Sequence, residues 1–260
     1  MYHDVVELDR ADGSGFRGHG PARYKLDPGD FERHLAAIAA IAATGRAPGS
    51  ALELLAPQDR ASVSRLFLTF DDGGASAAEI GASLARRGWI GHFFVTTDFI
   101  GKPGFLDVAA IAELARAGHV ICTHSCSHPI PMSQLPDDVL MDEWRRSIGV
   151  LSDITGTAVV IGSVPGGYSS RRVVRAAAAA GLQVLFTSEP VTASQRVDGC
   201  LVLGRYAILA GTAPETAAAL AAGKPLARLG QYVSWKTKGA AKAVLGDSYR
   251  RLRTAMLERS

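Results

Sequence analysis

Strand-like and helix-like segments alternate along most of this chain of 260 residues, and this order limits the folds open to it. Strands are predicted at residues 2–5, 66–70, 92–96, 120–123, 158–161, 183–186 and 201–203, and helices at about 31–43, 75–87, 107–117, 134–154, 170–180 and 214–222. The repeated β-then-α order predicts an α/β fold whose parallel sheet is closed into a barrel or doubly wound. Residues 11–25 are rich in Gly, Pro and Arg, which predicts an irregular loop that is a candidate lid.

The composition predicts one large α/β domain. A chain of 260 residues with 47% hydrophobic residues is long enough to bury a substantial core. No apolar stretch approaches the roughly 20 residues that a membrane-spanning helix needs. The first residues lack the basic start and apolar centre of a secretory signal, and three cysteines are too sparse for a disulfide framework. We therefore expect a cytoplasmic protein with reduced thiols.

Positive charge is concentrated in the C-terminal part of the chain. Residues 224–260 hold nine Lys and Arg against two acids, a net +7, so the other residues carry −4 of the total of +3. Apolar residues recur there at three- and four-residue steps, as in an amphipathic helix: Val244, Leu245, Tyr249, Leu252 and Met256. This pattern predicts two parts, an α/β body over residues 1–224 and a basic amphipathic helical tail over residues 225–260.

The predicted tail has two interpretations. It is either a helix packed on the barrel with a solvated basic face, or a surface that contacts an anionic membrane or a lipid-linked glycan. The second interpretation would put the protein at the inner face of the membrane as a peripheral protein. Nucleic-acid binding is not expected, because no recognised binding module accompanies the charge.

Two short clusters carry residues suited to hydrolytic chemistry. Asp71 and Asp72 follow an apolar run and precede Gly73, so they lie at the C-terminal end of a predicted strand. His124 and His128 are four residues apart, a spacing that one helical turn would bring onto the same face. One carboxylate and two imidazoles give a three-ligand metal site with an open position. The second carboxylate is then free to act as a base.

The clusters Thr69-Phe70-Asp71-Asp72-Gly73 and His124-Ser125-Cys126-Ser127-His128-Pro129 resemble the first two motifs of the polysaccharide deacetylases, carbohydrate esterase family 4. The resemblance covers roughly residues 1–210 and implies a distorted (β/α)7 barrel, here with a C-terminal helical extension. It also implies that Asp71 is the catalytic base and that Asp72, His124 and His128 bind one divalent ion. Such a ligand set suits Zn²⁺, but also Co²⁺, Ni²⁺ or Mn²⁺.

The expected catalytic acid is in an unusual place. The family's common arrangement takes a histidine from a late motif, but residues 201–206 contain none, and no histidine follows His128. The start of the chain, around His3, resembles the histidine-bearing first strand of circularly permuted family members. The resemblance therefore assigns His3 as the acid, with a structural histidine capping a terminal strand as the alternative. His92 and His119 are expected to be structural.

The third family motif is also altered. Ser163-Val164-Pro165-Gly166-Gly167-Tyr168 replaces the usual arginine-x-proline-aromatic-glycine. Its turn is expected to present the Gly166 or Gly167 N–H to an oxyanion, and Tyr168 is a candidate for substrate stacking. Ser163 cannot supply the guanidinium that orients the base, so Arg205 is expected to replace it from a late strand. The alternative for Arg205 is an ordinary surface ion pair.

These expectations combine into one function. The chain is predicted to be a metal-dependent N-deacetylase that hydrolyses the acetamide of an N-acetylamino sugar in a glycan, glycolipid or glycoside, with bacterial glycan biosynthesis as the favoured setting. The alternative is a catalytically weakened, metal-containing glycan-binding protein, because the motif arginine is missing and the histidine is relocated.

Overall fold

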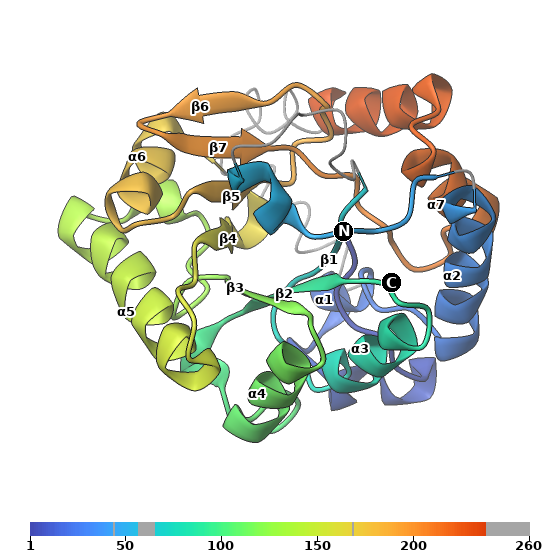
Figure 1. Ribbon diagram of the computed structural model, residues 1–260, viewed down its shortest axis with the longest axis horizontal. Coiled ribbons are helices and arrows are strands. Elements are labelled where there is room, and N and C mark those ends of the chain that lie inside the picture. The colour runs from blue at the N-terminus through green and yellow to red at the C-terminus, as the bar shows by residue number, and fades with distance from the viewer. Residues whose placement is uncertain (44, 57–65, 168, 238–260) are drawn as a thin grey trace.

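The computed structural model describes residues 1–43, 45–56, 66–167 and 169–237, and these contain one curled sheet surrounded by helices (Figure 1). The order of its strands is β1-β2-β3-β4-β5-β7-β6, and all neighbours are parallel except the hairpin β6–β7. The strands are β1 (Leu68–Phe70), β2 (Gly91–Val95), β3 (Val120–Thr123), β4 (Ile161–Ser163), β5 (Val184–Phe186), β6 (Gln195–Val197) and β7 (Cys200–Leu203). This half-barrel agrees with the predicted distorted (β/α)7 architecture.

The helices lie on the outside of the curled sheet (Figure 1). The α-helices are α1 (His19–Ala22), α2 (Pro28–Ala42), α3 (Ala77–Ala85), α4 (Val108–Arg116), α5 (Asp137–Thr155), α6 (Arg171–Ala179) and α7 (Pro214–Ala221), and residues 225–237 are also helical. Short 3₁₀ turns are η1 (Leu8–Gly13), η2 (Ala51–Leu55), η3 (Thr97–Phe99), η4 (Met132–Gln134) and η5 (Pro165–Gly167). The predicted tail beyond residue 237 lies outside the described residues.

The first residues of the chain fill the gap between the two ends of the sheet. The Tyr2 N–H donates to the Thr69 carbonyl over 2.7 Å, and the Ile208 N–H donates to the Met1 carbonyl over 2.9 Å. Residues 1–2 are therefore bonded both to β1 and to the segment that follows β7. The strand predicted at residues 2–5 is shorter than expected, since it consists of isolated bridges at Tyr2 and Val5; Val5 pairs with Leu26 rather than with β1.

Apolar side chains on both faces of the parallel strands build the core. All five residues of β2 are buried, as expected for a strand covered on both sides. The rings of Phe70 and Phe93 stack with centroids 5.1 Å apart, and Tyr2 stacks on Phe70 at 5.6 Å. These contacts fix the position of β1, whose C-terminal end carries Asp71 and Asp72.

Two sequence-based strand assignments are corrected by the structure. The strand predicted at 158–161 is observed as β4, Ile161–Ser163, because residues 158–160 form the connection from α5. The strand β6 was not predicted, since its edge position leaves Gln195 and Arg196 exposed and removes the apolar pattern. Asp198 and Gly199 adopt φ values of 49° and 87° in the tight turn that joins β6 to β7, and this Asp-Gly pair is the signal that could have revealed the hairpin.

Residues 11–25 are tied to the barrel and do not form a free lid. The Lys25 ammonium is buried and donates to the carbonyls of Ala11, Ser14 and Phe16 over 2.6–2.7 Å. The Gly15 N–H donates to the Gly104 carbonyl over 2.7 Å. Burying an ammonium group costs free energy unless it keeps its hydrogen-bond partners. Opening this loop would break the three hydrogen bonds from Lys25 and leave its charge without partners.

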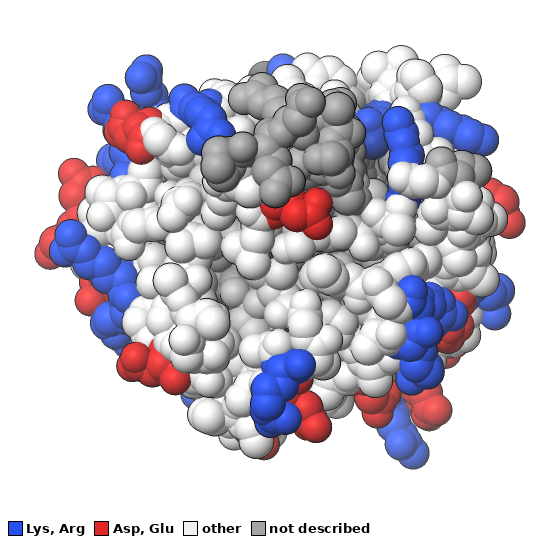
Figure 2. Space-filling view, viewed as in Figure 1, with Lys and Arg blue, Asp and Glu red and all other residues white. Residues whose placement is uncertain are grey.

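The end of the sheet where the strands begin is covered by η2. The Ala51 N–H donates to Nε2 of His92 over 2.9 Å, and η2 lies in front of the sheet in Figure 1. On the face seen in Figure 2, charged side chains gather mainly around the rim, while the centre is largely uncharged. The site residues predicted from the sequence lie at the opposite edge of the sheet, after the C-terminal ends of the strands.

Candidate metal and active site

The candidate site lies where the parallel strands end. Asp71 and Asp72 follow β1, His124 follows β3, Ser163 closes β4, and Arg205 comes two residues after β7. Because neighbouring parallel strands end on the same side of a sheet, side chains at these positions converge although they are far apart in the sequence.

Asp72, His124 and His128 form a candidate metal site. Their potential ligand atoms all lie within 4.8 Å of one another, and Oδ1 of Asp72 is 3.5 Å from Nε2 of His124 and 3.4 Å from Nε2 of His128. In a tetrahedral zinc site with bonds of roughly 2.0–2.1 Å, ligand atoms are about 3.3 Å apart. The two separations from Asp72 are close to this value, so the arrangement is compatible with a shared divalent ion.

Unusual backbone conformations bring these ligands together. Asp72, Ser125 and His128 have φ values of 77°, 65° and 60°, in the left-handed region that residues other than glycine rarely adopt. Residues 124–128 form a loop, so the helical turn expected from the four-residue spacing is wrong. Such strain costs about 1–3 kcal/mol per residue and persists only where the surroundings enforce it.

Glu143 of α5 is one such restraint, and it was not identified from the sequence. Its carboxylate accepts the N–H groups of Cys126 and Ser127 over 2.8 and 2.9 Å and the Ser127 hydroxyl over 2.5 Å. These three hydrogen bonds to one buried carboxylate fix the backbone of the loop at residues 124–128. Nothing in the local sequence around Glu143 distinguishes it from the other acids of α5.

Ser163 contacts a predicted metal ligand. Its Oγ lies 2.6 Å from Nδ1 of His124, and its carbonyl oxygen lies 3.1 Å from the same nitrogen. Both side chains are buried. In a metal-bound form, a hydrogen bond from Nδ1–H to Ser163 would leave Nε2 of His124 free of its proton, which is the form that binds a metal. The sequence showed what Ser163 lacks relative to the family motif, but not this contact.

Arg205 and Asp71 form a buried bidentate pair. Nη1 donates to Oδ1 over 2.6 Å and Nη2 to Oδ2 over 2.7 Å, and Nε donates to the Thr187 carbonyl over 3.0 Å. Arg205 is only 5% exposed, so the alternative of a surface ion pair is wrong. Burial alone would raise the pKa of Asp71, but the charge of Arg205 and the nearby His124 lower it below its ordinary value. Asp71 is therefore an ionised carboxylate at neutral pH.

The pKa of Asp72 is set by the same kind of opposing effects, and it is lowered further than that of Asp71. Burial would raise the pKa of its carboxyl group, whereas hydrogen bonds from His124 and His128 lower it well below the ordinary value. Two adjacent carboxylates are thus both ionised, but they face different partners: Arg205 for Asp71 and the imidazoles for Asp72.

His3 lies close to this site. Its ring packs on Tyr24 with centroids 4.5 Å apart, and its buried Nδ1 has no hydrogen-bond partner among the described residues. Burial lowers the pKa of His3, while the carboxylates of Asp72, Asp71 and Asp4 act in the opposite direction. A buried imidazole without a partner has a nitrogen left for a ligand.

His92 and His119 are structural, as expected. His92 accepts from the Ala51 N–H and its Nδ1 lies 3.0 Å from the Leu68 carbonyl. His119 accepts from the Gly91 N–H and contacts the Gly81 carbonyl over 2.9 Å. Both rings use their two nitrogens in backbone contacts, and burial lowers the pKa of His92 to about 4.

The altered third motif forms η5. Gly166 and Gly167 have φ values of 63° and 71°, which explains the two glycines at this turn. The Gly167 N–H donates to the Val164 carbonyl over 3.0 Å, so this N–H is occupied, and an oxyanion contact by Gly167 is no longer expected. Gly166 is exposed. Tyr168, the predicted stacking residue, lies outside the described residues.

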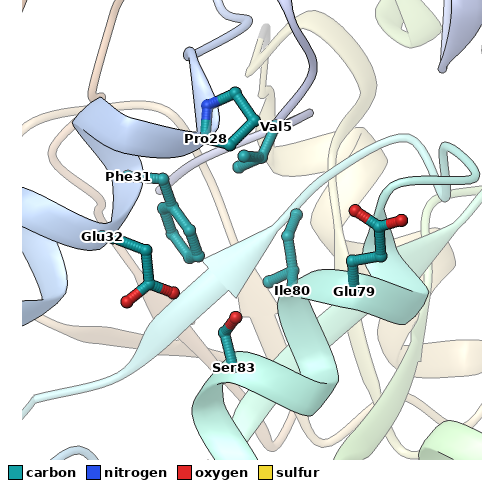
Figure 3. A pocket seen from close by; sticks show the side chains of 7 residues that line it. All are labelled: Val5, Pro28, Phe31, Glu32, Glu79, Ile80 and Ser83. Carbon is teal, nitrogen blue, oxygen red and sulfur yellow. The ribbon is translucent and has the colours of Figure 1, made fainter.

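Two pockets lie away from these residues. One, of about 70 Å³, lies between α2 and α3, where Figure 3 shows Glu32 and Glu79 on either side of Phe31 and Ile80. A larger one, of about 670 Å³, is lined by residues that precede β3 and β4, including Gly118 and Ala158. Neither is lined by a predicted site residue.

Comparisons with known proteins agree with this geometry. The family model for polysaccharide deacetylase matches residues 58–185. The fold is similar to the Streptococcus pyogenes deacetylase PplD in complex with acetate, with 19% identity, a TM-score of 0.67, and coverage of 83% of this chain and 93% of that chain. It is also similar to BC0361, a polysaccharide deacetylase from Bacillus cereus (20% identity, TM-score 0.70, coverage 85% and 67%).

A third similar structure is IcaB from Ammonifex degensii, at 17% identity and a TM-score of 0.64, with coverage of 85% of this chain and 95% of that chain. The comparison with curated protein sequences gives no match. At these identities the solved structures establish the fold, while the family model covers both motif clusters. The chain therefore belongs to the polysaccharide deacetylase family, a family of carbohydrate hydrolases.

Proposed function

We propose that this protein is a metal-dependent N-deacetylase that hydrolyses the acetamide of an N-acetylamino sugar in a glycan, glycolipid or glycoside. The observation that carries the proposal is the pairing of two adjacent carboxylates with different partners. Oδ1 of Asp72 lies 3.4–3.5 Å from Nε2 of two imidazoles, a separation expected between ligands of one metal ion, and Asp71 is held ionised beside them by Arg205.

Asp72, His124 and His128 would hold one divalent ion, with Zn²⁺ as the best match to one carboxylate and two imidazoles. When bound, such an ion lowers the pKa of water and polarises the acetyl carbonyl. Ser163 supports this role of His124, because its contact with Nδ1 leaves Nε2 available.

Asp71 would act as the general base. A base must be ionised and must keep its oxygens directed at the attacking water, and the bidentate contact with Arg205 supports both requirements. Arg205 would thus do from the segment after β7 what the motif arginine does from the position of Ser163. This replacement weakens the alternative of a glycan-binding protein that has lost its base.

His3 would act as the general acid toward the leaving amine. It lies on the chain segment bonded to β1 and its ring interacts electrostatically with Asp71 and Asp72. The imidazolium form is needed to donate a proton; burial disfavours that form and lowers the pKa of His3, and the nearby carboxylates oppose this effect. The Gly166 N–H would contribute to the oxyanion site, and Tyr168 would stack on the sugar.

Acetate release from a panel of N-acetylated mono- and oligosaccharides tests the proposed reaction. The wild-type protein should release acetate from at least one of them, and Asp71→Asn should lose this activity while still binding metal. A wild-type protein that binds these sugars and metal but releases no acetate from any of them would instead support the glycan-binding alternative.

We also propose contact with an anionic membrane surface through the helix at residues 225–237. This helix contacts the barrel through Gln231, which bonds the N–H and carbonyl of Ala207, and it exposes Leu226, Leu229 and Val233 by 84%, 54% and 51%. These three residues lie at i, i+3 and i+7, on one face. Apolar residues directed at solvent beside a segment of net positive charge are typical of a membrane-surface helix.

Vesicle flotation tests this contact. The wild-type protein should float with anionic but not with zwitterionic vesicles, and replacing Leu226, Leu229 and Val233 by Ser should abolish flotation. Serine at the exposed Val108, Val139 and Val150 provides a matched control that should not change it. Equal flotation of both triple variants would contradict the proposal. No helix among the described residues is long and apolar enough to cross a membrane.

A further inference from the structure

Asp4 has a buried carboxylate that the proposed reaction does not use. Its Oδ1 accepts the hydroxyl groups of Ser14 over 2.6 Å and of Ser76 over 2.9 Å. The Ser76 Oγ in turn accepts the Val5 N–H over 3.1 Å, and the Ser14 Oγ accepts the Ser76 N–H over 2.9 Å. The carboxylate of Asp4 therefore joins three segments: the start of the chain, the loop at residues 11–25, and the residue that precedes α3.

The Asp4 carboxylate lies in a space that exists only because two glycines border it. A Cβ atom at Gly15 would lie 2.0 Å from Oδ2 of Asp4, and one at Gly74 would lie 2.0 Å from Oδ1. A larger residue at either position would displace the carboxylate. Gly74 comes two residues after the predicted metal ligand Asp72, so Asp4 packs directly on the loop that carries the candidate site.

The backbone is fixed on both sides of His3. On one side, the Tyr2 N–H donates to the Thr69 carbonyl over 2.7 Å, and the Tyr2 carbonyl accepts the Asp71 N–H over 3.1 Å. On the other side, the carboxylate of Asp4 makes the two hydrogen bonds described above. His3 therefore lies between two residues that are each bonded to other parts of the barrel.

The ring of His3 has few restraints of its own. Its Nδ1 has no hydrogen-bond partner among the described residues, and the ring packs on Tyr24 with centroids 4.5 Å apart. The hydrogen bonds of the Asp4 carboxylate go to serine hydroxyl groups and not to this ring. The Leu26 N–H, two residues after Tyr24, donates to the Asp4 carbonyl over 3.0 Å. The position of the imidazole therefore depends on the backbone that Asp4 anchors, and not on a contact between the two side chains.

We propose that Asp4 is a positioning residue, which fixes the imidazole of His3 beside Asp71 and Asp72 through the backbone that it anchors. This inference rests on the proposed function, in which His3 is the general acid. A misplacement of about 1 Å at a reacting group can cost on the order of 10²-fold in rate. Removing the Asp4 carboxylate should therefore slow the reaction without removing any group that touches the substrate.

Acetate-release kinetics of Asp4→Ala in two backgrounds test this role. In the otherwise wild-type protein, Asp4→Ala should lower kcat by about 10–100-fold and leave KM nearly unchanged. In the His3→Gln protein, which lacks the acid, the same substitution should cause no further loss, because Asp4 acts only through His3. Asp4→Asn keeps an oxygen at the position of Oδ1 and should retain most of the rate. Equal losses in both backgrounds, no loss in either, or a loss in Asp4→Asn as large as that in Asp4→Ala would overturn the role.

Two further variants complete the kinetic test. Asp9→Ala, at an exposed acid of η1, is the matched control and should behave as wild type. Ser14→Ala removes one of the two hydrogen bonds to Asp4, so it should show a smaller loss with the same dependence on His3. It takes the place of Asp4→Ala if that variant does not fold. Metal content should be unchanged in all variants; a loss in Asp4→Ala would show that the carboxylate supports Asp72 instead and would overturn the role.

Histidine-selective NMR of chelator-treated protein separates this inference from the proposed function. His3→Gln identifies the imidazole signal of His3. Asp4→Ala should broaden this signal, because the ring then samples several positions, and should leave the signals of His92 and His119 narrow. If the wild-type protein releases no acetate and the His3 signal broadens in Asp4→Ala, the positioning role stands and the reaction fails. If acetate is released but the His3 signal stays narrow in Asp4→Ala, the reaction stands and the positioning role fails.

Discussion

Arg205 binds Asp71 through two buried hydrogen bonds of 2.6 and 2.7 Å, and it does so from the segment after β7 and not from β4, where the family motif would place an arginine. The guanidinium also lies 5.2 Å from the ring of Phe94 and 5.8 Å from that of Phe186. An arginine so enclosed belongs to the site and not to the surface. In the proposed function it takes the role of the motif arginine, which Ser163 cannot supply.

Arg205→Ala should destabilise the protein by about 3–5 kcal/mol, because it leaves the Asp71 carboxylate buried without its partner. Arg205→Lys keeps the charge but loses the bidentate geometry, so it should recover part of the stability and little of the activity. Urea denaturation together with acetate release measures both. A fully stable Arg205→Ala variant would show that the pair is not a structural requirement.

The pH dependence of stability should report on Asp71. Its pKa is lower in the folded protein than in the unfolded chain, so the carboxylate stabilises the fold fully above the unfolded value of about 3.9. This stabilisation is lost as pH falls through the lower folded value. In chelator-treated protein, the free energy of unfolding should therefore drop less steeply below about pH 4 for Asp71→Asn than for wild type.

The exposed acid Asp138 provides the control for that measurement. Asp138→Asn should reproduce the wild-type slope between neutral and acid pH. If Asp71→Asn and wild type lose stability in parallel, the lowered pKa of Asp71 does not contribute to acid unfolding.

Ser163→Ala should weaken metal binding about 10–100-fold, the usual effect of removing a hydrogen-bond partner from a ligating histidine. The retained Ser163 carbonyl, 3.1 Å from Nδ1, should prevent complete loss. Competition with a chelator measures the affinity without any substrate. Ser83→Ala, at a half-buried position of α3 where its hydroxyl contacts Arg86 away from the metal ligands, is the control. An unchanged affinity in Ser163→Ala would contradict the positioning role.

His3→Gln should lower kcat by about 10²–10⁴ and leave metal content unchanged, because the variant lacks a proton donor. Burial lowers the pKa of His3 below 6.5, and the acid is needed in its protonated form, so activity should fall as pH rises through that lowered value. The variant should lose this alkaline limb of the pH–rate profile. His19→Gln, at an exposed histidine of α1, should behave as wild type. Near-wild-type turnover of His3→Gln would require a different acid.

Much of the fold could be predicted because its signals are local. Apolar runs predict the strands, and glycines mark the ends of helices. Strands such as β2 and helices such as α4 agree with the predicted bounds to within one or two residues. Pairing is less predictable. The segment at residues 2–5 reads as a strand, yet only Tyr2 bridges β1, because Val5 turns to Leu26.

The residues of the candidate site also differ in how well the sequence predicts them. Asp71, Asp72, His124 and His128 belong to contiguous motifs and were identified as a group, and the fold brings them together. Glu143 and Ser163 act through contacts between different elements, so their roles depend on distances that no sequence spacing encodes. Arg205 was suggested from the sequence only because the motif arginine was missing.

The metal requirement of acetate release tests the central claim most directly. Protein treated with a chelator should release no acetate from an N-acetylated oligosaccharide that the untreated protein hydrolyses, and Zn²⁺ should restore the rate with saturation at one equivalent per chain. His128→Ala should not regain activity at that ratio. Full acetate release by metal-free protein would contradict the account.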